Sequence, residues 1–162
     1  MNKIIDLTHP ILEGMPIYPG TEPPVLKPEC TIDGIGFAEK KITMFSHTGT
    51  HMDAPAHLIK GAKTLDKFSV DQFYGTALVL DCTNLKGNII GLKELESFKN
   101  EIQNVEFVVL YTGWSKYWGS DKYFEDYPVL SGEAAKCLSK FELKGIGLDT
   151  ISADKILSLI HI

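Results

Sequence analysis

The sequence of 162 residues contains no arginine, and its 16 basic side chains are all lysines that are scattered along the chain. No basic cluster is larger than the pair Lys40–Lys41, and the formal net charge is −5. These features argue against nucleic acid and against an anionic membrane surface as partners. Without the planar fork of arginine, a strongly anionic substrate would be held by lysine, by backbone amides or by a metal.

Long apolar runs are absent as well, since none approaches the roughly 20 residues that span a bilayer. The N-terminus lacks the apolar segment of a signal peptide. The only cysteines are Cys30, Cys82 and Cys137, which are odd in number, widely spaced and without a C-x-x-C pair. This pattern argues against a disulfide framework and predicts a reduced, cytoplasmic setting. The glycine-rich signatures of dinucleotide and phosphate binding are also missing.

What remains is the composition of an ordinary globular protein, with 44% hydrophobic and 23% charged residues. The length predicts one domain over residues 1–162. Strands with nearly continuous apolar residues are expected at 41–46, 76–81, 105–111 and 145–149. Helices are expected around 92–98, from an N-cap at Ser131 onward, and over 152–162. This order predicts an α/β fold in which a mixed sheet, covered on both faces, is flanked by helices.

The chain is rich in metal-binding side chains at one place, residues 47–57, which read His-Thr-Gly-Thr-His-Met-Asp-Ala-Pro-Ala-His. This segment holds three of the five histidines and a carboxylate, all at odd-numbered positions. Imidazole and carboxylate are the usual ligands of a catalytic Zn²⁺ or a similar divalent ion at neutral pH. The segment therefore predicts a metal centre.

The spacing of these side chains restricts the backbone. In an extended strand His47 and His51 would lie about 13 Å apart, too far for bonds of about 2.0–2.1 Å to one metal. The chain must bend between them, either at Gly49 or through a helical turn. His51 and Asp53 share one face of an extended chain and can bind together. Three protein ligands leave positions open for water or substrate, which is the catalytic pattern.

The pattern H-x-G-T-H-x-D-x-P-x-H resembles that of the metal-dependent cyclase family, which includes bacterial kynurenine formamidases (arylformamidases) and isatin hydrolases. Segments 6–9, 18–20, 111–114 and 145–150 are also similar to stretches of that family. The resemblance implies a swivelling β/β/α domain. It further implies an oligomer, which we expect to be a homodimer or a homotetramer.

The resemblance also implies a role for each residue of the site. His47, His51 and Asp53 would hold a first metal, with Asp53 shared with a second. His57 would donate and accept the proton, and Tyr18 would contact an aromatic substrate. The metal would be Zn²⁺ or Mn²⁺, one or two per chain. The implied reaction is hydrolysis of the C–N bond of an aryl formamide, as in the conversion of N-formyl-kynurenine to kynurenine and formate in tryptophan catabolism.

The C-terminal part departs from the family, which carries a late histidine and then a glutamate for the second metal. His161 is the candidate histidine, but no glutamate follows before Ile162, and the C-terminus is shorter than usual. Asp149 is expected to orient the backbone or a ligand histidine. Two alternatives stay open. The chain could hydrolyse a cyclic amide or lactone such as isatin, or it could be a metal-binding domain without turnover.

Overall fold

The computed structural model describes residues 3–155. The chain divides into two compact units, Met1–Ala54 and Pro55–Ile162, and each is described by itself. The assignment of residues 1–162 to a single domain stays a prediction. In the described part, no helix combines the length and the apolar character that crossing a membrane requires.

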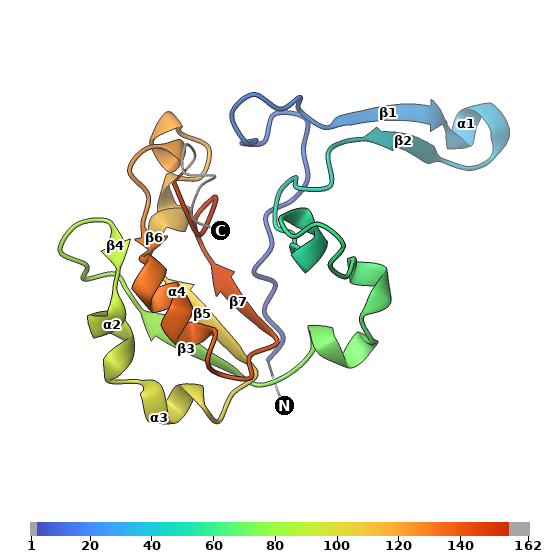
Figure 1. Ribbon diagram of the computed structural model, residues 1–162. Helices are drawn as coiled ribbons and strands as arrows, with labels where there is room; N and C mark the ends of the chain where they lie inside the picture. The colour runs from blue at the N-terminus through green and yellow to red at the C-terminus, as the bar shows by residue number, and fades with distance from the viewer. Residues whose placement is uncertain (1–2, 156–162) are drawn as a thin grey trace. The chain divides into compact units, whose positions relative to one another are not determined.

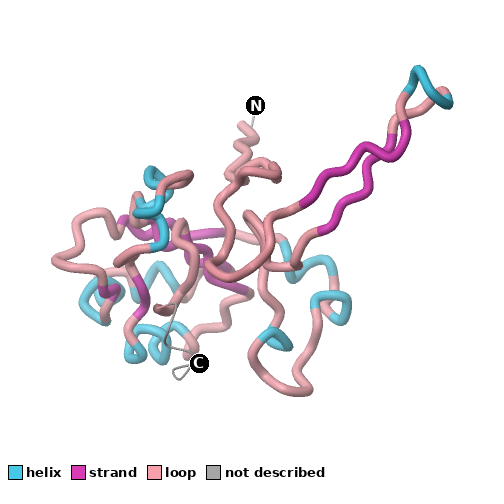
Figure 2. Tube along the Cα trace, turned by 90° about the horizontal axis from the view of Figure 1, so that it is seen from above, coloured by secondary structure: helices cyan, strands magenta, loops and turns pink. Residues whose placement is uncertain are grey.

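The first unit contains an antiparallel hairpin, with strand β1 (Val25–Cys30) paired to β2 (Glu39–Thr43). The short helix α1 (Ile32–Ile35) lies at the turn between them (Figures 1 and 2). The strand expected at 41–46 is therefore displaced, since it ends at Thr43. Its partner explains this end, because Val25 opposite Thr43 is preceded by Pro24. A proline has no backbone N–H to extend the ladder.

The second unit is built on a parallel sheet with the strand order β3-β5-β7. These strands are β3 (Ala77–Asp81), β5 (Phe107–Tyr111) and β7 (Gly145–Leu148). A second parallel pair joins β4 (Ile89–Ile90) to β6 (Val129–Leu130). Three of the expected strands are confirmed within two residues at each end. The parallel and antiparallel pairings occur in separate sheets.

The helices of the second unit are α2 (Leu92–Glu96), α3 (Lys99–Ile102) and α4 (Gly132–Leu138). The Ser131 hydroxyl accepts a hydrogen bond from the Ala134 N–H at 3.1 Å, which confirms the expected N-cap. Residues 152–155 form no helix, and the rest of the helix expected at 152–162 lies outside the described residues. Short 3₁₀ turns occur at η1 (Pro55–His57), η2 (Leu65–Lys67), η3 (Val70–Phe73), η4 (Trp114–Tyr117) and η5 (Asp121–Phe124).

The core of the second unit lies between one face of the β3-β5-β7 sheet and the three helices. Alternation along each strand directs Leu80, Val108 and Leu110 to this face, and they are at most 1% exposed. The helices contribute Leu95, Ile102, Ala134 and Leu138. On the opposite face Val79 is 59% exposed. The expected cover on both faces is thus incomplete within the described residues.

Candidate metal centre

A single left-handed residue bends the chain between the first two histidines of the motif. Gly49 has φ = +68°, a backbone angle that glycine adopts without steric cost. The segment from Ser46 to Ala54 contains no helix. Of the two bends that the sequence allowed, the structure therefore has the turn at Gly49. This turn brings His47 and His51 to the same side.

Three donor atoms converge at this turn. His47 Nδ1 lies 3.2 Å from His51 Nε2. Asp53 Oδ1 lies 2.6 Å from His47 Nδ1 and 3.3 Å from His51 Nε2. Among the described residues this is the one group of three or more His, Cys, Asp or Glu side chains whose possible ligand atoms all lie within 4.8 Å of one another.

The second ring nitrogen of His51 fixes the orientation of its imidazole. His51 Nδ1 lies 2.8 Å from the carbonyl oxygen of Gly49. A carbonyl can only accept a hydrogen bond, so Nδ1 is the donor in this contact, and in the neutral form of the ring the lone pair then lies on Nε2. Such a contact to the nitrogen opposite the ligand atom is the usual support of a metal-binding histidine. The turn at Gly49 thus both bends the chain and orients His51.

The geometry of the three donors fits a divalent transition metal. Bonds of about 2.0–2.2 Å place the ligand atoms around one tetrahedral ion roughly 3.3–3.5 Å apart, and closer in an octahedral arrangement. The separations of 2.6, 3.2 and 3.3 Å require little rearrangement. The side chains of His47, His51 and Asp53 are 38%, 30% and 54% exposed, which leaves room for further ligands from solvent. Two imidazoles and one carboxylate suit a divalent transition ion better than calcium or magnesium, which prefer oxygen ligands alone.

The other residues singled out in the sequence are not among these three donors. His57 is the last residue of η1, in the second unit, and is exposed. Tyr18 lies in the first unit, in a turn where the Thr21 N–H donates to its carbonyl oxygen, and is 37% exposed. His161 lies outside the described residues. The roles of His57 and Tyr18 stay predictions.

Asp149 orients the backbone, which is one of the two roles that the sequence predicted for it. Its Oδ1 accepts hydrogen bonds from the backbone N–H and the hydroxyl of Thr112, at 3.0 and 2.5 Å. Its Oδ2 accepts the Trp114 N–H at 2.9 Å. The indole of Trp114 in turn donates to the carbonyl oxygen of Tyr123 at 3.1 Å. Asp149 therefore connects the end of β7 to the turn that follows β5.

The buried thiol of Cys82, near this turn, is unreactive as a nucleophile. Cys82 is 5% exposed, and burial raises the pKa of its thiol to about 11, with a further contribution from the carboxylate of Glu94. The thiol therefore stays protonated at neutral pH. A buried, protonated thiol agrees with a packing role for Cys82.

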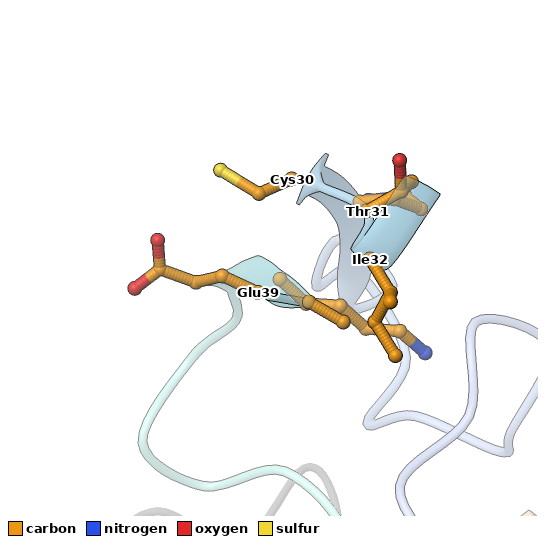
Figure 3. Close-up of a pocket in the computed structure, with 7 residues that line it drawn as sticks. Cys30, Thr31, Ile32 and Glu39 are labelled. Carbon is orange, nitrogen blue, oxygen red and sulfur yellow. The ribbon is translucent and has the colours of Figure 1, made fainter. Parts of the chain in front are cut away.

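A pocket in the first unit lies at the tip of the hairpin and contains none of the three donors. Pro28, Cys30, Thr31, Ile32, Ala38, Glu39 and Lys40 line it. Figure 3 shows the Cys30 thiol and the Glu39 carboxylate directed to one side and the Ile32 side chain to the other. The lining holds no histidine, so it lacks the imidazole base that commonly activates a thiol.

Comparisons with known proteins place these features in context. The Cyclase family matches residues 5–155. The kynurenine formamidase of Bacillus cytotoxicus is 32% identical over 153 residues, which cover 94% of this chain and 70% of that protein. A predicted metal-dependent hydrolase from Bacillus stearothermophilus has a TM-score of 0.75 at 26% identity, covering 95% of this chain and 72% of that one. Isatin hydrolase A from Labrenzia aggregata has a TM-score of 0.83 at 23% identity, covering 98% and 72%. The expected α/β fold class and the family resemblance are confirmed.

Proposed function

This chain belongs to the Cyclase family, and we propose that it is a metal-dependent amide hydrolase that cleaves the C–N bond of an aryl formamide such as N-formyl-kynurenine. The observation that carries the proposal is the convergence of His47 Nδ1, His51 Nε2 and Asp53 Oδ1. The kynurenine formamidase relatives support the choice of substrate. The formamide group in which the bond breaks is itself uncharged, so holding this group does not require an arginine.

His47, His51 and Asp53 would hold the metal, which we propose to be Zn²⁺, with Mn²⁺ as the alternative and one or two ions per chain. When bound, such an ion lowers the pKa of water toward about 7 and polarises a carbonyl oxygen. The contact between His51 Nδ1 and the Gly49 carbonyl would hold the ring with Nε2 directed toward the ion. The free second oxygen of Asp53 is the position at which a second ion would be shared.

His57 would move the proton that the reaction requires. An aryl amine leaves poorly as an anion, so its nitrogen must gain a proton as the C–N bond breaks. An imidazole exchanges protons readily near neutral pH, and His57 is an exposed histidine four residues beyond Asp53. We assign it the transfer of a proton from the attacking water to the departing nitrogen.

The remaining parts of the proposal concern recognition and setting. The partly exposed ring of Tyr18 would contact the aromatic part of the substrate. We propose a homodimer or a homotetramer as the assembly. The three cysteines are free thiols, which supports a cytoplasmic location.

The likeness to isatin hydrolase A favours one alternative substrate, a cyclic amide of the isatin type. The same donors would serve, because ring opening is also attack by water on an amide carbonyl. The other alternative is a metal-binding domain without turnover. Parallel assays on N-formyl-kynurenine, formylanilide and isatin distinguish formamide hydrolysis, cyclic amide hydrolysis and metal binding without turnover.

The decisive experiment measures metal content and hydrolysis in the same preparations. We expect the unmodified protein to hydrolyse N-formyl-kynurenine faster than isatin. Asp53→Ala should lose both metal and activity, whereas His57→Ala should keep its metal and lose at least about a hundredfold in rate. Asp33→Ala, which removes an exposed carboxylate of α1 in the same unit, is the matched control. Metal binding without hydrolysis of any of the three compounds would refute the proposed activity.

A further inference from the structure

A methionine outside the histidine motif packs against the turn that carries it. Met15 is 7% exposed, although residues 10–14 before it are all exposed. Its Cε atom lies 3.0 Å from the position that a Cβ atom on Gly49 would occupy, and Ile11 Cγ1 lies 3.7 Å from the same position. The turn at Gly49 is therefore enclosed on its Cα side by the side chains of the segment that ends at Met15.

This contact is connected to a metal-binding nitrogen by one further step. The carbonyl of Gly49 faces His51 Nδ1 at 2.8 Å, and the other nitrogen of that ring points to His47 and Asp53. Glycine has the widest range of backbone angles of any residue. A free glycine in this position could rotate its carbonyl away and release the imidazole, and the packing of Met15 restricts this rotation.

A second contact joins the same two segments. The backbone N–H of His9 donates to the Thr50 hydroxyl at 3.1 Å, across 41 positions of the sequence. Thr48, on the other side of Gly49, is 7% exposed. The turn is thus held on both sides of Gly49, by burial before it and by a hydrogen bond after it.

We propose that residues His9–Met15 form a brace that keeps the three donors in their binding geometry. Met15 within the brace and Thr50, which accepts the hydrogen bond from the His9 N–H, are positioning residues, and Met15 acts through Gly49 and His51. The inference rests on the proposed metal centre, but it is independent of the substrate. Its physical basis is that donors held in place before the ion binds lose less conformational freedom when it binds. Partners that orient metal ligands typically change affinity by ten- to a hundredfold.

The test measures the Zn²⁺ affinity of the 162-residue chain by competition with a chromophoric chelator. Met15→Ala, which leaves a gap against Gly49, should bind Zn²⁺ at least tenfold more weakly, while Met15→Leu should restore most of the affinity. Met44→Ala is the control, since Met44 belongs to the same unit and is 43% exposed. A folded Met15→Ala protein with unchanged affinity would overturn the role of Met15.

A second pair of variants tests the hydrogen bond between His9 and Thr50. It also keeps the proposal testable if Met15→Ala does not fold. Thr50→Val keeps the shape of the side chain but removes the acceptor for the His9 N–H, whereas Thr50→Ser keeps it. Thr50→Val should weaken Zn²⁺ binding and alter the visible spectrum of the Co²⁺-loaded protein, and Thr50→Ser should not. Far-UV circular dichroism establishes folding, and if Met15→Ala does not fold, the Thr50 pair decides.

Equal affinity of both Thr50 variants and the unmodified chain would refute the brace. Tight Zn²⁺ binding that weakens as expected, in a protein without hydrolysis, would support the brace and refute the proposed activity.

Discussion

Replacing Asp149 by alanine removes the acceptor of three hydrogen bonds that hold the turn after β5. The backbone N–H of Thr112, a residue only 8% exposed, then loses its acceptor. The Trp114 N–H keeps only its longer contact with the Thr112 hydroxyl oxygen, at 3.3 Å. An unsatisfied buried donor costs about 1–3 kcal/mol. Because Asp149 itself is only half-buried, water can replace part of its role, so the lower part of that range applies to each donor. We expect Asp149→Ala to destabilise the second unit by about 2–3 kcal/mol.

The chain contains its own control for this substitution. Asp81 accepts the same pair of hydrogen bonds from the N–H and the hydroxyl of Thr83, at 2.9 and 2.6 Å, but in an exposed turn. Water can take over these bonds, so Asp81→Ala should cause a clearly smaller loss. Both sites have an Asp–Thr pair of hydrogen bonds, which is local and exposed at Asp81 but long-range and partly buried at Asp149.

Urea unfolding followed by tryptophan fluorescence is the appropriate assay. Both tryptophans of the chain, Trp114 and Trp118, belong to the second unit, so the signal reports that unit alone. Asp149→Ala should lower the urea midpoint without a large change in the slope of the transition. Midpoints for Asp149→Ala and Asp81→Ala that fall together would refute the argument, because burial would then make no difference.

Three further predictions concern an ion pair, a helix cap and the reactivity of the cysteines. The hydrogen bond from the Lys144 ammonium lowers the pKa of the Glu106 carboxyl. The ionised carboxylate therefore stabilises the fold above its ordinary pKa of about 4.5 and loses this effect as the pH falls. Glu106→Gln should lower the urea midpoint at pH 7 and less so near pH 3, and an equal shift at both would contradict the ion pair. Ser131→Ala should cost about 1 kcal/mol in the same assay through loss of the N-cap, and an unchanged midpoint would contradict that role. Iodoacetamide at pH 8 should label Cys30 before Cys82, whose thiol pKa is about 11; the reverse order in mass spectra would show that Cys82 is accessible and ionised.

The parts of the fold that the sequence predicts are those with a local cause. The strands at 76–81 and 105–111 are apolar runs with many β-branched residues, and the structure has β3 and β5 there. Ser131 caps α4 because its own hydroxyl reaches the Ala134 N–H three residues later. Each of these signals is complete within a few neighbouring residues, so no knowledge of the tertiary structure is needed to read it.

The errors have distant causes. The strand expected at 41–46 ends at Thr43 because of its partner strand, which begins after a proline 19 positions earlier in the sequence. The exposure of Val79 likewise depends on what covers the outer face of β3, which an apolar pattern does not specify. An apolar run predicts a strand well, but it does not predict where the strand loses its partner or on which face it lacks cover.

The candidate metal centre depends on both local and distant residues. The spacing of His47, His51 and Asp53 requires a bend, and Gly49 provides it, so the position of the donors follows from seven consecutive residues. The orientation of the His51 ring depends on the Gly49 carbonyl. The side chain that encloses this glycine, Met15, lies 34 positions earlier. Two proteins that share the eleven-residue motif can therefore have the same donors and still differ in metal affinity, if the residues that pack on the glycine differ.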